Sequence, residues 1–198
     1  MRSLRIALVI LLTAAAAGQS VPSPGADLQV LVSVQDDGSV IGIEHLQLPG
    51  RMLVPLRWRV PTVTTTPLGA TRRRYVDLLE VTDGHETKLR YSLRQYRDYV
   101  EVEIPPQPLA LNIARISYSV RNGVQFGDEH DELFWKVANT WNVPLAAIGG
   151  AVMVPTAAVG QFTARAFPSE QSRTLTIEGR SLSWASENGA QQIGRAHV

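Results

Sequence analysis

The chain has 198 residues, a formal net charge of +1 and no cysteine. Without cysteine it forms no disulfide and offers no thiolate zinc site, no cysteine nucleophile and no lipid-modified cysteine. A charge this close to zero creates no global field that attracts polyanions, so we expect no nucleic-acid partner. The length fits a single domain behind a processed leader.

The N-terminus has the three parts of an export signal. Arg2 and Arg5 give a positive start, Ile6 to Leu12 is apolar, and Ala14 to Ala17 supplies small residues for cleavage. The apolar run is shorter than the about 20 residues that a membrane-spanning helix needs. We predict a signal peptide over residues 1–17, with an uncleaved anchor as the alternative. A flexible lead-in over residues 18–27 follows.

Residues 28–184 read as short strands separated by turns. Leu28 to Val34 alternates apolar and polar residues, which is the pattern of a half-buried strand. Asp37-Gly38 then predicts a hairpin turn, and Asn122-Gly123 predicts another. Pro55 interrupts the apolar run Leu53 to Val60, which is typical of an edge strand or irregular chain. Many short strands with regular turns predict an all-β fold, an antiparallel β-sandwich of immunoglobulin-like or related type.

The segment from Asp131 to Pro155 is the most distinctive stretch of the chain. It resembles the N-terminal domain of the YciQ-like predicted membrane proteins, a family defined only as a domain of unknown function. The residues that carry the resemblance are Asp131, Glu132, Leu133, Trp135, Trp141, Pro144 and Pro155. Upstream, Asp37-Gly38-Ser39-Val40 and Glu44 resemble the opening hairpin of the family.

The resemblance implies an extracytoplasmic β-rich domain followed by a transmembrane helix and a further region. Residues 185–192 would then be a linker toward that membrane segment. Residues 193–198 match one reading frame of a common sequencing adapter that runs into a stop codon. We interpret them as an artefact and the gene as truncated after Gln192.

Trp135 and Trp141 have two readings. They form either an aromatic platform for a sugar or part of the core, and the core is favoured because a buried Trp between sheets is usual in sandwiches. Phe134 and Trp135 are adjacent on a predicted strand and therefore point to opposite faces. One of the two is thus a candidate for an interaction surface.

The densest acidic cluster is a weak candidate for calcium. Asp128, Glu129, Asp131 and Glu132 surround His130, and oxygen-rich clusters suit calcium in an exported protein. The spacing does not match an EF-hand loop, so a solvated acidic loop is the favoured reading. No motif calls for a cofactor.

Basic residues concentrate in the middle of the chain. Residues 51–100 hold ten Lys or Arg and five Asp or Glu, a balance of +5, so a patch for anionic lipid headgroups or acidic wall polymers is an alternative to a solvated face. Its candidate members are Arg72, Arg73, Arg74, Lys88, Arg90, Arg94 and Arg97.

The sequence shows no catalytic motif. His45, His85 and His130 are widely spaced and show no ligand pattern. We therefore predict a non-enzymatic domain at the cell envelope, exported and anchored through a membrane segment, that binds an envelope protein or surface ligand. The alternatives are a secreted carbohydrate- or calcium-binding module and, below it, an envelope hydrolase built on His45 or His130.

Overall fold

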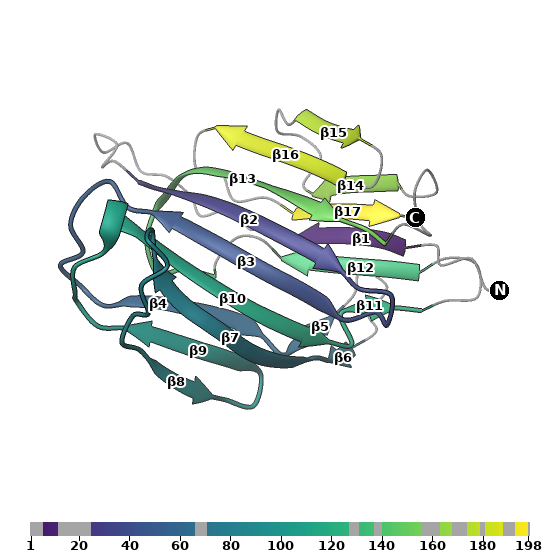
Figure 1. The fold of residues 1–198 in the computed structure, drawn as a ribbon. Coiled ribbons are helices and arrows are strands. Elements are labelled where there is room, and N and C mark those ends of the chain that lie inside the picture. Colours follow the sequence, from purple (N-terminus) through teal and green to yellow (C-terminus); the bar gives the residue numbers. More distant parts are fainter. Residues whose placement is uncertain are drawn as a thin grey trace, which may run out of the picture.

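The computed structural model describes residues 6–11, 25–65, 71–126, 131–136, 140–155, 163–167, 174–178, 181–187 and 193–197 (Figure 1). Within these ranges the fold is all-β with one short 3-10 turn, as predicted. None of these segments forms a helix with the length and apolarity needed to cross a bilayer.

The first strands of the chain are β1 (Ile6–Leu11), β2 (Ala26–Val34), β3 (Val40–Gln47), β4 (Leu56–Pro61), β5 (Val63–Thr65), β6 (Thr71–Arg73), β7 (Tyr75–Asp83), β8 (Ser92–Gln95) and β9 (Tyr99–Ile104). The 3-10 turn η1 (Ala110–Asn112) follows, and then β10 (Ile113–Arg121), β11 (Val124–Gln125), β12 (Asp131–Lys136), β13 (Leu145–Met153), β14 (Thr163–Phe167), β15 (Thr174–Glu178), β16 (Ser181–Glu187) and β17 (Ile193–His197).

The larger layer is a seven-stranded sheet with the order β15-β16-β13-β2-β3-β10-β7. The predicted hairpin joins β2 to β3, and the Asp37 carboxylate accepts a hydrogen bond from the Ser39 backbone in its turn. β13 pairs with β2 in parallel, whereas the other pairs of this sheet are antiparallel. β13 thus lies inside this sheet, between β16 and β2.

The opposing layer is built from smaller pieces. β4, β9 and β8 form an antiparallel sheet. Its β4 edge is extended by an isolated bridge between Trp58 and Trp141, where the Arg59 N–H donates to the Thr140 carbonyl at 2.6 Å. β12 belongs to a five-stranded sheet with the order β1-β14-β17-β12-β11 and contributes Leu133 and Trp135 to the same core.

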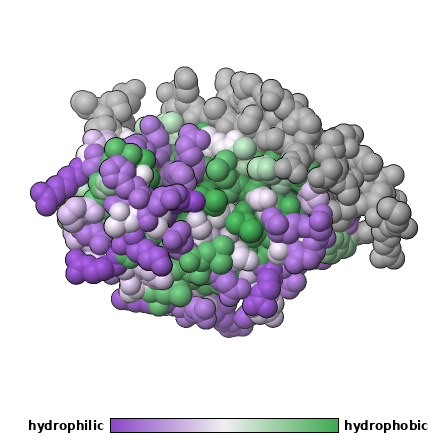
Figure 2. Space-filling view, viewed as in Figure 1, coloured by the Kyte–Doolittle hydropathy of each residue, from purple (hydrophilic) through white to green (hydrophobic). Residues whose placement is uncertain are grey.

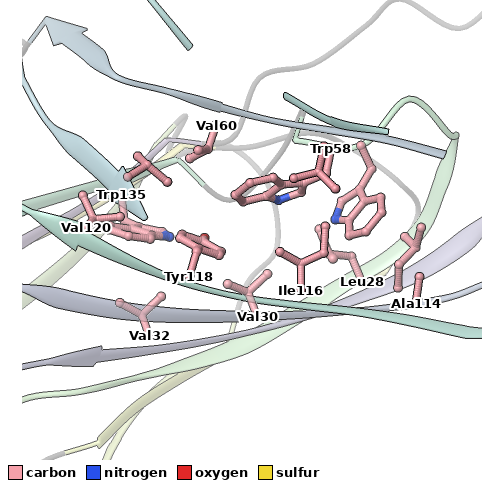
Figure 3. Packing of buried hydrophobic residues seen from close by; sticks show 14 of the residues in the cluster. Leu28, Val30, Val32, Trp58, Val60, Ala114, Ile116, Tyr118, Val120 and Trp135 are labelled. Atoms are coloured by element: carbon pink, nitrogen blue, oxygen red, sulfur yellow. The ribbon is translucent and has the colours of Figure 1, made fainter. Parts of the chain in front are cut away.

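The core lies between these layers, and the strand pattern places it there. In β2 the residues Leu28, Val30 and Val32 are buried while the intervening positions face outward. Together with the inward residues of β10 they pack against Trp58, Val60 and Trp135 (Figure 3). Burying each large apolar side chain contributes about 1.5–3 kcal/mol, so this alternation decides which face of each strand points inward.

Two strands of the five-stranded sheet lie in segments that the sequence predicts to be a signal peptide and an artefact. β1 lies in the predicted signal peptide and pairs in parallel with β12, and β17 lies in the predicted adapter-derived tail and pairs with β14. The core residues described above fall between Ala26 and Val154. Cleavage of the leader and the origin of the tail stay predictions.

The domain limits differ slightly from the observed strands. β2 begins at Ala26, inside the predicted lead-in over residues 18–27. β16 continues to Glu187, inside the predicted linker over residues 185–192. Pro55 lies just before β4, so Leu53 and Val54 are in a loop rather than in the strand that follows.

A single glycine makes room for the largest ring on β10. Gly42 is the cross-strand partner of Tyr118, and a Cβ at position 42 would lie 2.5 Å from Cζ of that ring. Tyr118 is almost fully buried and contacts Trp58, with the ring centroids 4.7 Å apart. The missing side chain at position 42 therefore allows Tyr118 to lie across β3.

We expect Gly42→Ala to lower the free energy of unfolding by about 1–3 kcal/mol, because the added methyl displaces the Tyr118 ring in a closely packed core. Urea denaturation followed by tryptophan fluorescence measures the change. Gly50→Ala is the matched control, since a Cβ there meets nothing within 4 Å. Equal effects of the two substitutions would contradict the proposed packing role of Gly42.

Candidate functional site

The most unusual chemical feature of the interior is a buried carboxylate. Glu44 of β3 is 1% exposed, and its two oxygens accept three hydrogen bonds. The Tyr118 hydroxyl donates to Oε1 at 2.9 Å, while the Thr140 hydroxyl and the Trp141 indole N–H donate to Oε2 at 3.0 and 2.8 Å. Glu44 therefore connects β3 to β10 and to the segment that extends β4.

The local pattern of β3 puts Glu44 inside. Val40, Gly42, Glu44 and Leu46 are buried in alternation, so Glu44 occupies a position where an apolar residue is expected. The preceding hairpin fixes the register, because a slip by one residue would turn this whole set outward. In the sequence, Glu44 was noted only as part of the family hairpin, and its buried role was not predicted. The signal that could have predicted it is its place among the apolar positions of an alternating strand.

Burial is the dominant influence on the ionisation of Glu44. Removal of the carboxyl from water raises its pKa above the ordinary value, and the hydrogen bonds from Tyr118, Thr140 and Trp141 oppose the rise. The pKa of Tyr118 is also raised, first by its own burial and then by the nearby Glu44 carboxylate. A protonated Glu44 keeps every contact if Oε1 donates to the Tyr118 oxygen while Oε2 accepts from the other two groups.

Aromatic rings surround this network. The Trp135 ring stacks with Tyr118 at a centroid separation of 6.2 Å, and the Arg74 guanidinium lies 5.8 Å from the Trp135 centroid. Desolvation lowers the pKa of Arg74 to about 10, so this residue stays charged at neutral pH. The Trp58 indole also favours the charged form of Glu44, but its N–H has no acceptor in hydrogen-bond geometry.

The family-motif residues are mostly interior. Trp135 is 3% exposed and Trp141 is 6% exposed, which favours the core reading over an aromatic platform. Asp131, Leu133 and Pro155 are buried as well, whereas Pro144 is exposed. The side chains of Glu132 and Phe134 lie outside the described structure, so the predicted outward face of β12 is not placed.

Most of the predicted calcium candidates lie outside the described residues. Asp128, Glu129 and His130 lie outside the described residues, and Asp131 is buried. In the part of the chain that the structure describes, no three histidine or acidic side chains gather as metal ligands would. His45 faces outward on β3 with its pKa lowered by partial burial and by Arg115, and His85 is exposed in a turn.

The predicted basic patch is divided by the fold. Arg74 is buried, and Arg94 lies beside the buried carboxylate of Glu101. Glu101 also pairs with Arg59 across the outer face of the three-stranded sheet. Lys88 and Arg90 are exposed in the turn after β7. The seven arginines and lysines therefore do not share one surface.

A surface candidate lies where β3, β7 and β9 end. The three loops there, residues 48–55, 84–91 and 105–112, are called the loop end below. Among the described large hydrophobic side chains, the most exposed are Leu53 at 77%, Leu111 at 61% and Val54 at 60%. All three lie on the loop end, where hydrophobic side chains reach the surface among hydrophilic ones at the left of the view (Figure 2).

Several other exposed aromatic rings have partners on the surface. Phe126 lies against the turn at Gly38, because a Cβ on that glycine would meet its ring at 2.5 Å. Arg121 lies over the ring of Tyr75, and Tyr96 stacks on Tyr99. The loop end differs from these sites, since its three most exposed hydrophobic side chains, Leu53, Leu111 and Val54, are aliphatic.

The raised pKa of Glu44 gives its stability contribution a defined pH dependence. The unfolded chain releases the proton near the ordinary value of 4.5, before the folded chain does. As pH rises from there toward the native pKa, the wild type loses up to about 1.4 kcal/mol per pH unit relative to Glu44→Gln. Below that window the two proteins should be similarly stable, because the amide mimics the protonated acid. Urea titrations over a pH series measure the difference, and parallel profiles would contradict it.

Glu44→Leu supplies the complementary case. It removes the acceptor of three buried donors, each of which costs about 1–3 kcal/mol when unsatisfied, so we expect a loss of at least about 3 kcal/mol at every pH. The same denaturation series measures this loss. A variant as stable as the wild type would show that the three donors do not depend on Glu44.

Solved structures with a related arrangement are distant. A putative protease from Parabacteroides distasonis matches at 8% identity and a TM-score of 0.43 over 88% of this chain and 40% of its own. An M1 zinc metallopeptidase from Deinococcus radiodurans matches at 13% identity and a TM-score of 0.42, over 87% of this chain and 42% of its own. Leukotriene A4 hydrolase from Saccharomyces cerevisiae matches at 11% identity and a TM-score of 0.46, over 87% of this chain and 28% of its own. The chain thus spans less than half of each, and these similarities assign no activity to it.

The family comparison is more informative. Among curated proteins, no sequence matches this chain. The family model described as "Predicted membrane protein (DUF2207) N-terminal domain" matches residues 26–190. This range begins at the first residue of β2 and includes both the hairpin and the tryptophan segment that carried the YciQ-like resemblance. The chain therefore belongs to the DUF2207 family of predicted membrane proteins and contains the N-terminal domain of that family.

Proposed function

We propose that this domain is a non-enzymatic binding domain, held outside the cytoplasm by a membrane-tethered envelope protein. The observation that carries the proposal is the contrast between interior and surface. The polar groups around Glu44 are occupied with one another inside the sandwich. The loop end, in contrast, presents three aliphatic side chains to the outside. A domain of this kind is suited to contact rather than to reaction.

The location is supported by two independent features. The N-terminus reads as an export leader. The family is named for membrane proteins, and the matched range is described as their N-terminal domain, which supports a membrane region later in the full-length chain. A leader followed by a domain and then a membrane segment leaves that domain on the outer side of the membrane.

The carbohydrate- or calcium-binding alternative has less support. It relied on exposed tryptophans and on the acidic cluster around Asp131. Trp135, Trp141 and Asp131 are all buried, so neither feature offers those groups to a ligand. Exposed Tyr96 stacks on Tyr99, and the ring of Tyr99 is only partly exposed and has the Arg59 guanidinium over it.

The absence of cysteine from the chain allows a direct test of orientation. Ser92→Cys places a thiol on the exposed edge strand β8 of the full-length protein. We expect a membrane-impermeant maleimide to label it in intact spheroplasts, because the domain lies outside the cytoplasm. Labelling is measured by gel shift against the unsubstituted parent.

Val102→Cys is the matched control, because Val102 is completely buried on the adjacent strand β9. It should be labelled only after denaturation, and this result would show that the domain is folded in the membrane-anchored, full-length protein. If Ser92→Cys reacts only after the spheroplasts are lysed, the domain faces the cytoplasm and the proposed function is wrong.

A further inference from the structure

We propose that the loop end binds the surface of the lipid bilayer. Leu53, Val54 and Leu111 enter the interface, and Arg51, Lys88 and Arg90 contact anionic headgroups. The inference rests on the proposed function, since it assumes that the domain is held beside a membrane. It adds a specific ligand, anionic phospholipid, and a specific surface.

The first argument is that the loops hold the apolar side chains outward. Leu111 has φ 56° and Asn112 has φ 54°, in the left-handed region of backbone conformation that residues other than glycine adopt only uncommonly. For a leucine this conformation carries strain, and such strain persists only where surrounding contacts impose it. Leu111 is therefore both strained in its backbone and exposed to solvent.

The contacts that impose this conformation come from neighbouring loops and strands. The Ala110 N–H donates to the Asp83 carboxylate at 3.3 Å, and the Gln47 amide donates to the Leu111 carbonyl at 2.8 Å. The Leu48 N–H donates to the Asn112 carbonyl at 2.9 Å. Each of these bonds ties the loop tip to β3, to β7 or to the loop after β3. The tip is therefore preorganised, and little conformational entropy is lost when it binds.

The second argument is charge. The three loops contain Arg51, Lys88 and Arg90 against a single acidic residue, Glu86, which gives 3 − 1 = +2. Glu86 pairs with Arg115 at 2.8 Å, so its charge is already matched by the sheet. Basic groups around exposed aliphatic side chains fit the headgroup region of a bilayer, where phosphates lie just above the apolar boundary.

The third argument is the direction in which the chain leaves the domain. The strand register aligns one row of residues across five strands: Glu187, Ala147, Asp27, Gln47 and Ile113. Glu187 is the last residue of β16, and Ile113 follows directly after η1. The end of β16 thus lies at the same end of the sheet as the loop end. The family match stops at residue 190, three residues beyond Glu187. With residues 193–198 interpreted as an artefact, a membrane segment that follows Gln192 starts from this side, whereas β17 itself runs back toward the end where β11 and β12 pair.

A probe on the loop end tests the inference. Leu53→Cys, labelled with the environment-sensitive fluorophore NBD, should show a blue shift and an emission increase of about twofold or more when vesicles of equal parts phosphatidylglycerol and phosphatidylethanolamine are added. The change arises because the fluorophore leaves water for the interface. A fluorophore reports only its own surroundings, so the apolar N-terminal segment of the purified chain does not contribute to this signal.

Leu93→Cys with the same label is the matched control, because Leu93 is an exposed leucine on β8, outside the loop end. Its emission should not change. Equal responses at the two positions, or no response at position 53, would overturn the inference and leave the loop end as a contact for a protein.

Side-chain and charge variants sharpen the test. Leu53→Ser with Val54→Ser and Leu111→Gly should weaken vesicle binding at least about tenfold, because the buried apolar area is lost. Glycine is chosen at position 111 because it tolerates the positive φ, so the loop stays folded. Arg51→Gln and Lys88→Gln should each reduce binding to the anionic vesicles about fivefold, without a matching effect on pure phosphatidylcholine. Unchanged binding in all of these variants would overturn the inference.

The two proposals fail in different ways. If the domain is labelled from outside in spheroplasts but the probe at position 53 never responds to vesicles, the membrane contact is wrong and the proposed function stands. If the domain is labelled only from the cytoplasm, the proposed function is wrong whatever the vesicles show.

Discussion

The Glu44 carboxylate is the constraint on which the arrangement of the two layers depends. It accepts from a hydroxyl on the same sheet and from two groups on the opposing layer, 96 and 97 residues later in the chain. Replacing the whole hydrogen-bonded group by well-packed apolar residues would change stability little, whereas removal of Glu44 alone leaves its three donors unsatisfied. Its main effect is on specificity, because any other alignment of the layers leaves the carboxylate or its three donors without partners.

The local part of the fold could be predicted from the sequence. The alternation of Leu28 to Val34 and the turn at Asp37-Gly38 predicted β2 and the hairpin that follows it, because side-chain burial in a strand has a period of two. The distant part could not. The parallel pairing of β13 with β2 and the contact of Thr140 with Glu44 join residues about 100 positions apart or more, and no local pattern encodes such pairings. Arg74 shows the same limit, since its burial against Trp135 cannot be read from a run of three arginines.

The buried state of the family motif changes what the motif means. Trp135, Trp141 and Leu133 are core residues, so a sequence pattern built on them identifies a packing arrangement rather than a binding surface. The residues that face the outside at the loop end are Leu53, Val54 and Leu111, and none of them belongs to the motif. In the sequence, Leu53 and Val54 belong to an apolar run that Pro55 interrupts. Such a run is compatible with an edge strand and with an exposed loop, because the two contain the same residue types.

The interior and the loop end are mechanically linked through one short segment. Asn142 follows Trp141, whose indole donates to Glu44, and the Asn142 side chain donates to the Pro55 carbonyl at 3.2 Å while accepting from the Arg57 N–H at 2.6 Å. Pro55 is the residue after Val54, so the loop that carries two of the exposed aliphatic side chains is fixed by the same segment that Glu44 holds. The buried carboxylate therefore has two roles in one structure. It aligns the layers, and through Asn142 it keeps the loop that carries Leu53 and Val54 at a set position relative to them.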